Sequence, residues 1–217
     1  MDEQKKKKQQ EKLIMKVLGH IRDHQFVQMN MEDMARLMGI SRATLYKYFA
    51  NKEEIFEHFT DGLITYFELN KEAENEDQSF GEQFQHVFEQ STSLALLVPD
   101  TFLKQLEEMY PEMYSRLNEA ISKWHKKVVT FYEDGAEKGI FRLLNPNLLI
   151  AQQQIFETLF NPKFLMQNQL TVEQALWDFY ELQKYQLFKE CHLKEVNDEV
   201  MSPKIMYLTN KITNLIF

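Results

Sequence analysis

Residues 30–55 read NMEDMARLMGISRATLYKYFANKEEI, and this pattern predicts two short helices joined by a tight turn. A helix over residues 31–38 places apolar side chains on one face, where a second helix can pack against them. Gly39 follows that helix, and a glycine tolerates the positive φ that such a turn requires. Ser41 then provides the N-cap of the second helix, whose Leu45 contributes to the shared core. Two helices connected in this way form a helix-turn-helix.

The second helix has an exposed face that carries no carboxylate. Its exposed positions combine hydrogen-bond donors with small groups: Arg42, Ala43, Thr44, Tyr46 and Lys47. Side chains of these kinds pair with base edges in the major groove, and the absence of acidic groups avoids repulsion by the phosphates. The face therefore suits the major groove of DNA.

The segment MARLMGISRATLYKYFANKEEIF, residues 34–56, resembles the DNA-binding signature of the TetR family of bacterial transcriptional regulators. The matching positions fall in the family's register without a gap: Ala35, Gly39, Ile40, Ser41, Thr44-Leu45-Tyr46, Tyr48-Phe49 and Lys52-Glu53. Residues 137–142, EKGIFR, are more weakly similar to the family's turn after its seventh helix. Met31 and Met34 depart from the family, which often has Thr and Ile there, and this changes packing or a phosphate contact rather than the motif.

The resemblance implies a homodimer whose two heads lie in successive major grooves of a palindromic, double-stranded operator. It also implies repression of transcription until a small-molecule inducer binds the body. The residues then expected to read base edges are Arg42, Ala43, Thr44 and Lys47. Those expected to contact phosphates are Ser41, Tyr46 and Lys52. Tyr46 could instead pack between helices, but its position beside Lys47 on the exposed face favours the phosphate contact.

Helix-start signals recur along the chain and predict an all-α fold. Four capping boxes place a side-chain acceptor before a helix and a polar partner three residues later: Asn30/Asp33, Asn51/Glu54, Ser79/Glu82 and Thr171/Gln174. Two more caps precede a proline at the first helical position, Asn145-Pro146 and Ser202-Pro203. We expect an N-terminal three-helix helix-turn-helix DNA-binding head, residues 1–52, joined to a helical ligand-binding and dimerisation body, residues 53–217.

Charge is divided unevenly between these two parts. Residues 1–52 hold eleven basic and six acidic side chains, a net charge of +5, whereas the remaining 165 residues hold 14 and 27, a net charge of −13. A basic part on an acidic body is expected where one end contacts a polyanion such as DNA. The run from Lys5 to Lys8, taken alone, is better explained as a solvated helix end.

Composition disfavours several other classes of protein. No apolar run approaches the roughly 20 residues that span a bilayer, and the N-terminal lysines are not followed by a secretory apolar segment. We therefore expect a cytoplasmic protein with no membrane partner. Cys191 is the single cysteine, so no intrachain disulfide can form, while His20 and His24 lack a third metal ligand nearby. Because catalytic and dinucleotide-binding motifs are also missing, we expect no metal, no cofactor and no enzyme activity.

Apolar stripes in the body are wide enough to line a ligand cavity. The candidate lining residues are Phe84, Phe88, Trp124, Val128 and Phe131. Each one taken singly is better explained as ordinary core. As a set they favour an adaptable, aromatic cavity and a largely apolar inducer of unknown identity.

Two helices carry apolar residues on more than one face and predict a dimer interface. They span residues 146–160 and 172–188, and two such helices from each subunit form a four-helix interface. The candidate interface residues are Leu148, Ile155, Leu159, Leu176 and Phe179. A further amphipathic segment over residues 203–217 could either cover part of that bundle or be a disordered terminus.

The leading hypothesis is a ligand-responsive DNA-binding repressor. Two alternatives remain open: an activator or DNA-binding factor without an inducer, and a small-molecule carrier or interaction protein with a vestigial head. The intact face with Arg42, Thr44, Tyr46 and Lys47 argues against the second alternative.

Overall fold

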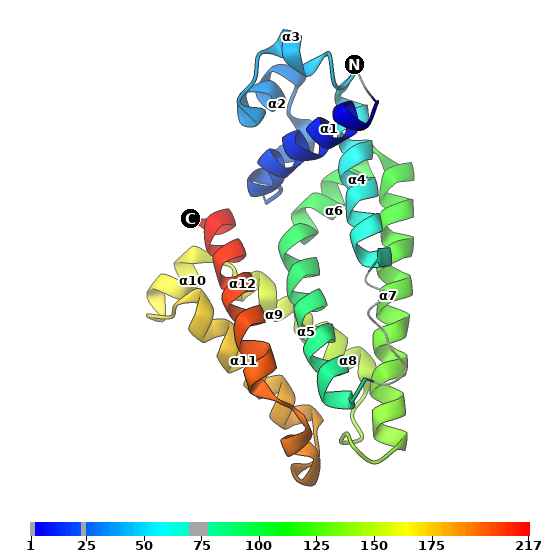
Figure 1. Cartoon of the computed structure of the whole chain (residues 1–217), viewed down its shortest axis with the longest axis vertical. Helices are drawn as coiled ribbons and strands as arrows, with labels where there is room; N and C mark the ends of the chain where they lie inside the picture. Colours follow the sequence, from blue (N-terminus) through cyan, green and yellow to red (C-terminus); the bar gives the residue numbers. More distant parts are fainter. Residues whose placement is uncertain (1–2, 23–24, 70–77) are drawn as a thin grey trace. The chain divides into compact units, whose positions relative to one another are not determined.

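The structure is a computed structural model that describes residues 3–22, 25–69 and 78–217. The described residues are helical almost throughout, and the strand-like pairing found among them is an isolated antiparallel bridge between Phe141 and Phe188 (Figure 1). The all-α prediction is therefore confirmed. The chain forms two compact units, one of Met1–Asn70 with Leu97–Ile121 and one of Lys71–Leu96 with Ser122–Phe217. The division of functions at residue 52 is a separate matter and stays a prediction.

The helix-turn-helix lies in the first unit, where α2 (Met31–Met38) and α3 (Arg42–Leu45) pack with α1 (Glu3–Val17) (Figure 1). The capping box at the start of α2 is confirmed, because the Asn30 side chain accepts from the Asp33 amide and the Asp33 carboxylate accepts from the Asn30 amide. Gly39 ends α2 with φ of 68°, as the turn requires. The fully buried side chains of this three-helix core include Val17, Met34, Met38, Leu45 and Phe49.

The same unit contains α4 (Lys52–Leu69), α6 (Asp100–Met109) and the beginning of α7 (Pro111–Glu137). An aromatic cluster joins α4 and α6. The ring of Phe26, in a short 3₁₀ turn (Phe26–Gln28), lies 5.5 Å from Phe56 of α4 and 6.2 Å from Phe102 of α6. Such aromatic pairs add roughly 0.5–1.5 kcal/mol each beyond the burial of their surface.

The second unit contains α5 (Phe80–Leu97) and the rest of α7, followed by α8 (Pro146–Ala151), α9 (Ile155–Leu159), α10 (Pro162–Gln167), α11 (Val172–Leu187) and α12 (Asp198–Ile216). Its core is rich in aromatic rings. Phe141 lies 5.2 Å from Phe131 and 4.8 Å from Phe188, and Gly135 of α7 leaves room for it. A Cβ at residue 135 would collide with the Phe141 ring, which explains the glycine inside this helix.

Two predicted helix boundaries were wrong. The helix expected over residues 146–160 is broken by a 3₁₀ segment, Gln152–Gln154. Ser202 is not a cap, because α12 begins at Asp198 with Asn197 as its cap and has Pro203 inside it. Asp198 is bound there by Lys184 and Tyr180, a tertiary contact that local sequence does not reveal.

Two further expectations concern what the described residues lack. Within these residues, no helix has the length and hydropathy needed to cross a membrane. No cluster of three potential metal-binding side chains occurs in the ranges that the structure describes. His24, half of the histidine pair considered above, lies outside the described residues.

Candidate nucleic-acid interface and ligand pocket

The recognition segment, residues 41–47, is a short helical projection fixed by two buried side chains. Leu45 and Phe49 are fully buried, and the amide of Phe49 donates to the carbonyl of Leu45 at 3.0 Å, so helical bonding continues beyond the end of α3. Ser41 caps the segment, because its hydroxyl accepts from the Thr44 amide at 3.1 Å. The segment is therefore held by its inner face while its outer face is free to bind.

The structure places most of the predicted DNA-binding residues on that outer face. Five of them are exposed (Ser41, Arg42, Ala43, Tyr46 and Lys47), and Thr44 is half-buried. The guanidinium of Arg42 lies 5.6 Å from the centre of the Tyr46 ring, and its hydrogen bond with Tyr46 raises the pKa of Arg42. The Ser41 and Thr44 hydroxyls are 2.9 Å apart. This arrangement offers two basic groups, Arg42 and Lys47, and several hydroxyl groups on one surface, which matches the chemistry of phosphates and base edges.

Lys52 has different surroundings from the other predicted phosphate contacts. Its ammonium donates to the carbonyl of Val27 at 3.1 Å and lies 5.9 Å from the Tyr110 ring. Partial burial lowers the pKa of Lys52. One of the three ammonium donors is thus used inside the first unit, so the phosphate contact stays a prediction that needs a separate test.

Two side chains of α1 support the recognition segment, and sequence reasoning missed both. The amide group of Gln10, which is buried, donates to the carbonyl of Tyr48 at 2.8 Å, and the ammonium of Lys16 donates to the carbonyl of Met38 at 2.8 Å. The bonds satisfy backbone carbonyls at the ends of the two helices of the motif. A polar Gln10 within the apolar stripe of α1 was the available signal.

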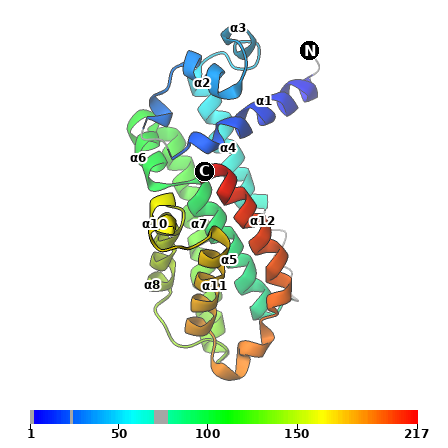
Figure 2. The ribbon, with the colours of Figure 1, turned by 90° about the vertical axis from the view of Figure 1, so that its left-hand side faces the viewer.

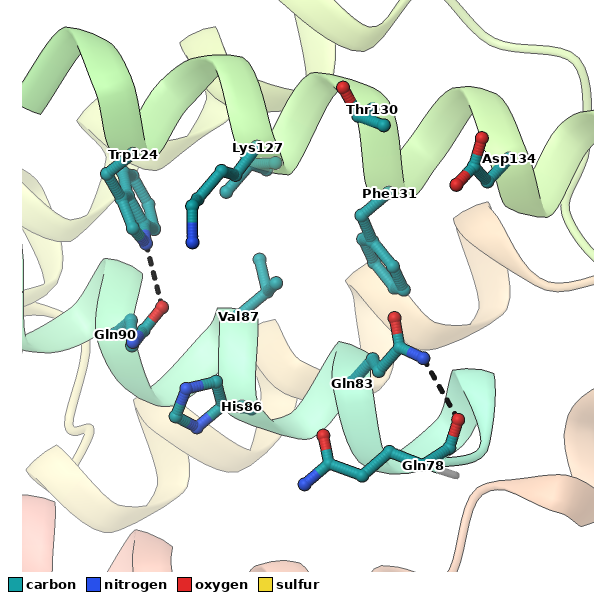
Figure 3. A pocket seen from close by; sticks show the side chains of 11 residues that line it. Gln78, Gln83, His86, Val87, Gln90, Trp124, Lys127, Thr130, Phe131 and Asp134 are labelled. Atoms are coloured by element: carbon teal, nitrogen blue, oxygen red, sulfur yellow. Dashed lines mark hydrogen bonds between the residues drawn. The ribbon is translucent and has the colours of Figure 1, made fainter. Parts of the chain in front are cut away.

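A pocket of about 490 Å³ lies in the second unit between α5 and α7 (Figure 3). Its lining includes three of the five residues predicted for a ligand cavity: Trp124, Val128 and Phe131. The other two, Phe84 and Phe88, lie in the core instead, with their rings 5.4 Å and 5.3 Å from Tyr180. This side of α5 packs against α11. Sequence periodicity identifies the apolar side of a helix but not the element that packs against it.

The pocket is more polar than the sequence predicted. Seven of its eleven lining residues are polar: Gln78, Gln83, His86, Gln90, Lys127, Thr130 and Asp134. The indole N–H of Trp124 donates to the Gln90 side-chain oxygen at 2.7 Å, which fixes one end of the pocket. Figure 3 shows Lys127 extending from α7 into the space between the two helices. Apolar and hydrogen-bonding groups therefore line the same space.

The predicted dimer residues separate into two groups. Leu148 of α8 and Ile155 of α9 are 67% and 41% exposed, and Leu159 is half-buried. Leu176 and Phe179 of α11 are instead 1% and 5% exposed, and the Phe179 ring packs 5.0 Å from the Phe156 ring of α9. These two residues are therefore core residues, because α11 turns this side toward the rest of its unit.

Residues 21–59 match a family model described as bacterial regulatory proteins, tetR family. No curated protein sequence matches the chain significantly. Among solved structures, the ketosteroid transcriptional regulator KstR2 of Mycobacterium tuberculosis is similar with a TM-score of 0.62, at 17% sequence identity over 84% of this chain and 96% of that chain. A putative TetR-family regulator from Rhodococcus sp. is similar with a TM-score of 0.51, at 14% identity over 80% of this chain and 98% of that chain.

A further similar structure is that of AibR in complex with isovaleryl coenzyme A and operator DNA. Its TM-score is 0.51, at 14% identity over 78% of this chain and 95% of that chain. At these identities the structures show a shared fold, a helix-turn-helix head with a helical body.

Proposed function

We propose that this chain is a TetR-family transcriptional repressor that binds a palindromic operator as a homodimer, because residues 21–59 match the family model and the fold is similar to that of a solved transcriptional regulator. The observation that carries the proposal is the recognition segment, which exposes Arg42, Tyr46 and Lys47 and no carboxylate. The buried side chains of Leu45 and Phe49 hold this segment in place. Thr44 and Arg42 read base edges in this proposal, and Ser41 and Tyr46 contact phosphates. The protein acts in the cytoplasm, with the DNA, and has no enzymatic activity of its own.

A selection from a random DNA pool with the purified protein tests the proposal. We expect enrichment of a palindrome whose half-sites are about one helical turn apart or a multiple of it, because a two-fold dimer presents two equivalent heads. Enrichment of a single unpaired half-site would contradict the dimer. Failure to enrich any sequence would instead favour a carrier or interaction protein with a vestigial head.

The ligand that we propose is amphipathic rather than largely apolar. Trp124, Val128 and Phe131 provide an apolar wall, while Gln83 and Gln90 belong to the polar part of the lining. The structure of AibR, a protein with a similar fold, contains isovaleryl coenzyme A and operator DNA, so a protein of this fold can bind both a small molecule and an operator. In this chain we propose that a ligand bound in the pocket releases the operator. A regulator without an inducer is the alternative, and it would keep its operator in the presence of any compound that binds the pocket.

The dimer that we propose uses α8 and α9, where Leu148 and Ile155 are exposed. Large apolar side chains at the surface of a helix are common at subunit interfaces. Because Leu176 and Phe179 are buried, the outward side of α11 contributes other residues, and its exposed apolar side chains are Leu182 and Tyr185.

A further inference from the structure

Two helices of the second unit border the pocket from opposite sides. Helix α5 and the second half of α7 lie side by side and run in opposite directions (Figure 1 and Figure 2). Each helix contributes two polar lining residues that are seven positions apart: Gln83 and Gln90 on α5, and Lys127 and Asp134 on α7. Seven residues make about two turns, so the members of each pair share one face and lie about 10 Å apart along their helix. Figure 3 shows Gln90 at the Lys127 end of the pocket and Gln83 at the Asp134 end.

The Lys127 end of the pocket offers hydrogen-bond donors. The side-chain oxygen of Gln90 accepts from the indole N–H of Trp124 at 2.7 Å, so this amide can offer its N–H groups to a ligand. Lys127 adds an ammonium group, which extends into the space between the helices (Figure 3). Residues 122–130 of α7 include three lysines and no carboxylate, so the charge of this segment is positive. An anionic group of a ligand is therefore favoured at this end.

The Asp134 end offers hydrogen-bond acceptors. The side-chain amide of Gln83 donates to the backbone carbonyl of Gln78 at 2.9 Å, and Figure 3 shows its oxygen turned toward α7. Asp134 adds a carboxylate to the lining. Residues 131–137 of α7 include three carboxylates and no lysine or arginine, and Lys138, which follows them, does not line the pocket. This end therefore favours a cationic group.

The wall between the two ends is apolar. Trp124, Val128 and Phe131 are spaced four and three residues apart, so they lie on one face of α7 and line the pocket together. Val87 of α5 lines the same space between the two ends (Figure 3). An apolar segment of a ligand can bury its surface against these side chains.

We propose that the ligand is a zwitterion with an apolar middle. Its anionic group, such as a carboxylate, binds Lys127 and Gln90, and its ammonium group binds Asp134 and Gln83. The two charged groups are about 10 Å apart, which is the separation of Lys127 and Asp134 along α7. The inference rests on the proposed ligand-responsive function and names the chemical class of that ligand. Charge-assisted hydrogen bonds at both ends fix the orientation of such a molecule.

Ligands with a single charge fit this pocket less well. An apolar acid would bring its hydrocarbon end against the Asp134 carboxylate, and an apolar amine would bring its hydrocarbon end against the Lys127 ammonium. A charged group that loses water without gaining a partner costs free energy. A zwitterion provides a partner of the opposite charge at each end.

Three compounds with the same number of carbon atoms test the inference. They are ω-aminooctanoic acid, which carries both charges, octanoic acid, which lacks the amine, and octylamine, which lacks the carboxylate. We expect the zwitterion to bind at least about tenfold more tightly than either of the others, because only it forms charge-assisted hydrogen bonds at both ends. Calorimetric titration of the full-length protein measures the three affinities.

Substitutions that remove one charge assign each end of the ligand. Lys127→Gln should weaken binding of the zwitterion about tenfold and leave the affinity for octylamine unchanged. Asp134→Asn should weaken the zwitterion equally and leave the affinity for octanoic acid unchanged. Lys126 and Glu133 are exposed neighbours on α7 that do not line the pocket, so Lys126→Gln and Glu133→Gln are matched controls that should change no affinity. Circular dichroism checks that all four variants fold.

The outcomes separate this inference from the proposed function. Equal affinity for the three compounds, tighter binding of octanoic acid or octylamine, or no binding of the zwitterion at millimolar concentration would overturn the inference. Equal effects of the lining and control substitutions would overturn it as well. Operator binding is measured separately with the same protein. An operator that stays bound when the zwitterion fills the pocket would remove ligand-responsive repression but leave the ligand class in place.

Discussion

Lys47 and Lys52 are five residues apart, yet their ammonium groups have different surroundings. Lys47 is exposed on the recognition segment, whereas Lys52 donates to the Val27 carbonyl and is partly buried. Residue type predicted a DNA contact for both. The structure separates Lys47, an exposed basic group available to contact DNA, from Lys52, which also stabilises the fold of the head.

Substitution of Lys52 distinguishes these two roles. In Lys52→Met the Val27 carbonyl loses a charged donor, so we expect the free energy of unfolding to fall by about 1–2 kcal/mol. If the lysine does not contact phosphate, the slope of log K against log salt should stay at the wild-type value. A slope that becomes less negative by about 1 for each head would show that Lys52 does contact a phosphate.

Thr44 provides the test of base reading. Thr44→Ala removes a hydroxyl but keeps the amide that donates to Ser41, so the cap of the recognition segment persists. We expect a loss of about 1–3 kcal/mol in binding to the selected operator and little change in binding to random duplex DNA. Titration of both DNAs at one salt concentration measures the difference. Equal losses on the two DNAs would assign Thr44 to the backbone instead.

At the scale of whole helices, local interactions could be predicted from the sequence and tertiary ones could not. The Asn30 and Thr171 capping boxes were correct because both partners lie within three residues of each other. The predicted start of α12 was wrong because a partly buried ion pair between Lys184 of α11 and Asp198 holds the true start of the helix. Phe84 was predicted to line a pocket and Phe179 to lie in a dimer interface, but both side chains are buried in the core of the second unit. Sequence periodicity identifies an apolar face of a helix without identifying what covers that face.

Glycine substitutions test the packing of α7 against Phe141. Gly135→Ala should lower the free energy of unfolding by about 1–3 kcal/mol, because the added methyl group collides with the Phe141 ring. Gly62 of α4 is the matched control, since a Cβ there meets no atom within 4 Å. Gly62→Ala should therefore stabilise the protein by up to about 1 kcal/mol. Denaturant unfolding of both variants provides the comparison, and stabilisation by both would contradict the close approach.

For the whole molecule, the uneven charge predicts how DNA binding depends on salt. Residues 1–52 carry +5 and the remainder carries −13, so attraction to DNA is confined to the head. If each head of a dimer makes about four to six phosphate contacts, the slope of log K against log salt should be roughly −7 to −11. Sedimentation at the same salt concentrations controls for dissociation of the dimer. A slope near zero for an intact dimer would contradict the proposed DNA-binding surface of the head.

Release of the operator upon ligand binding is also a property of the whole molecule. A ligand can shift the population from 1:99 to 99:1 only if it favours the DNA-incompetent state by about 5.5 kcal/mol. In a Trp177→Phe background the emission of Trp124, which lines the pocket, should change over the concentration range in which the operator is released. Trp124→Ala should lose this response while retaining operator binding. Normal release by that variant would place the ligand elsewhere.

The support that α1 gives to the recognition segment has a consequence for how operator preference can change. Gln10 and Lys16 hold the main-chain oxygens of Tyr48 and Met38, and these oxygens are present whatever side chains occupy residues 42–44 and 46–47. These two hydrogen bonds therefore do not depend on the identity of the exposed side chains. Substitution of those side chains, in evolution or by design, can change the preferred operator sequence while the backbone that presents them keeps its position.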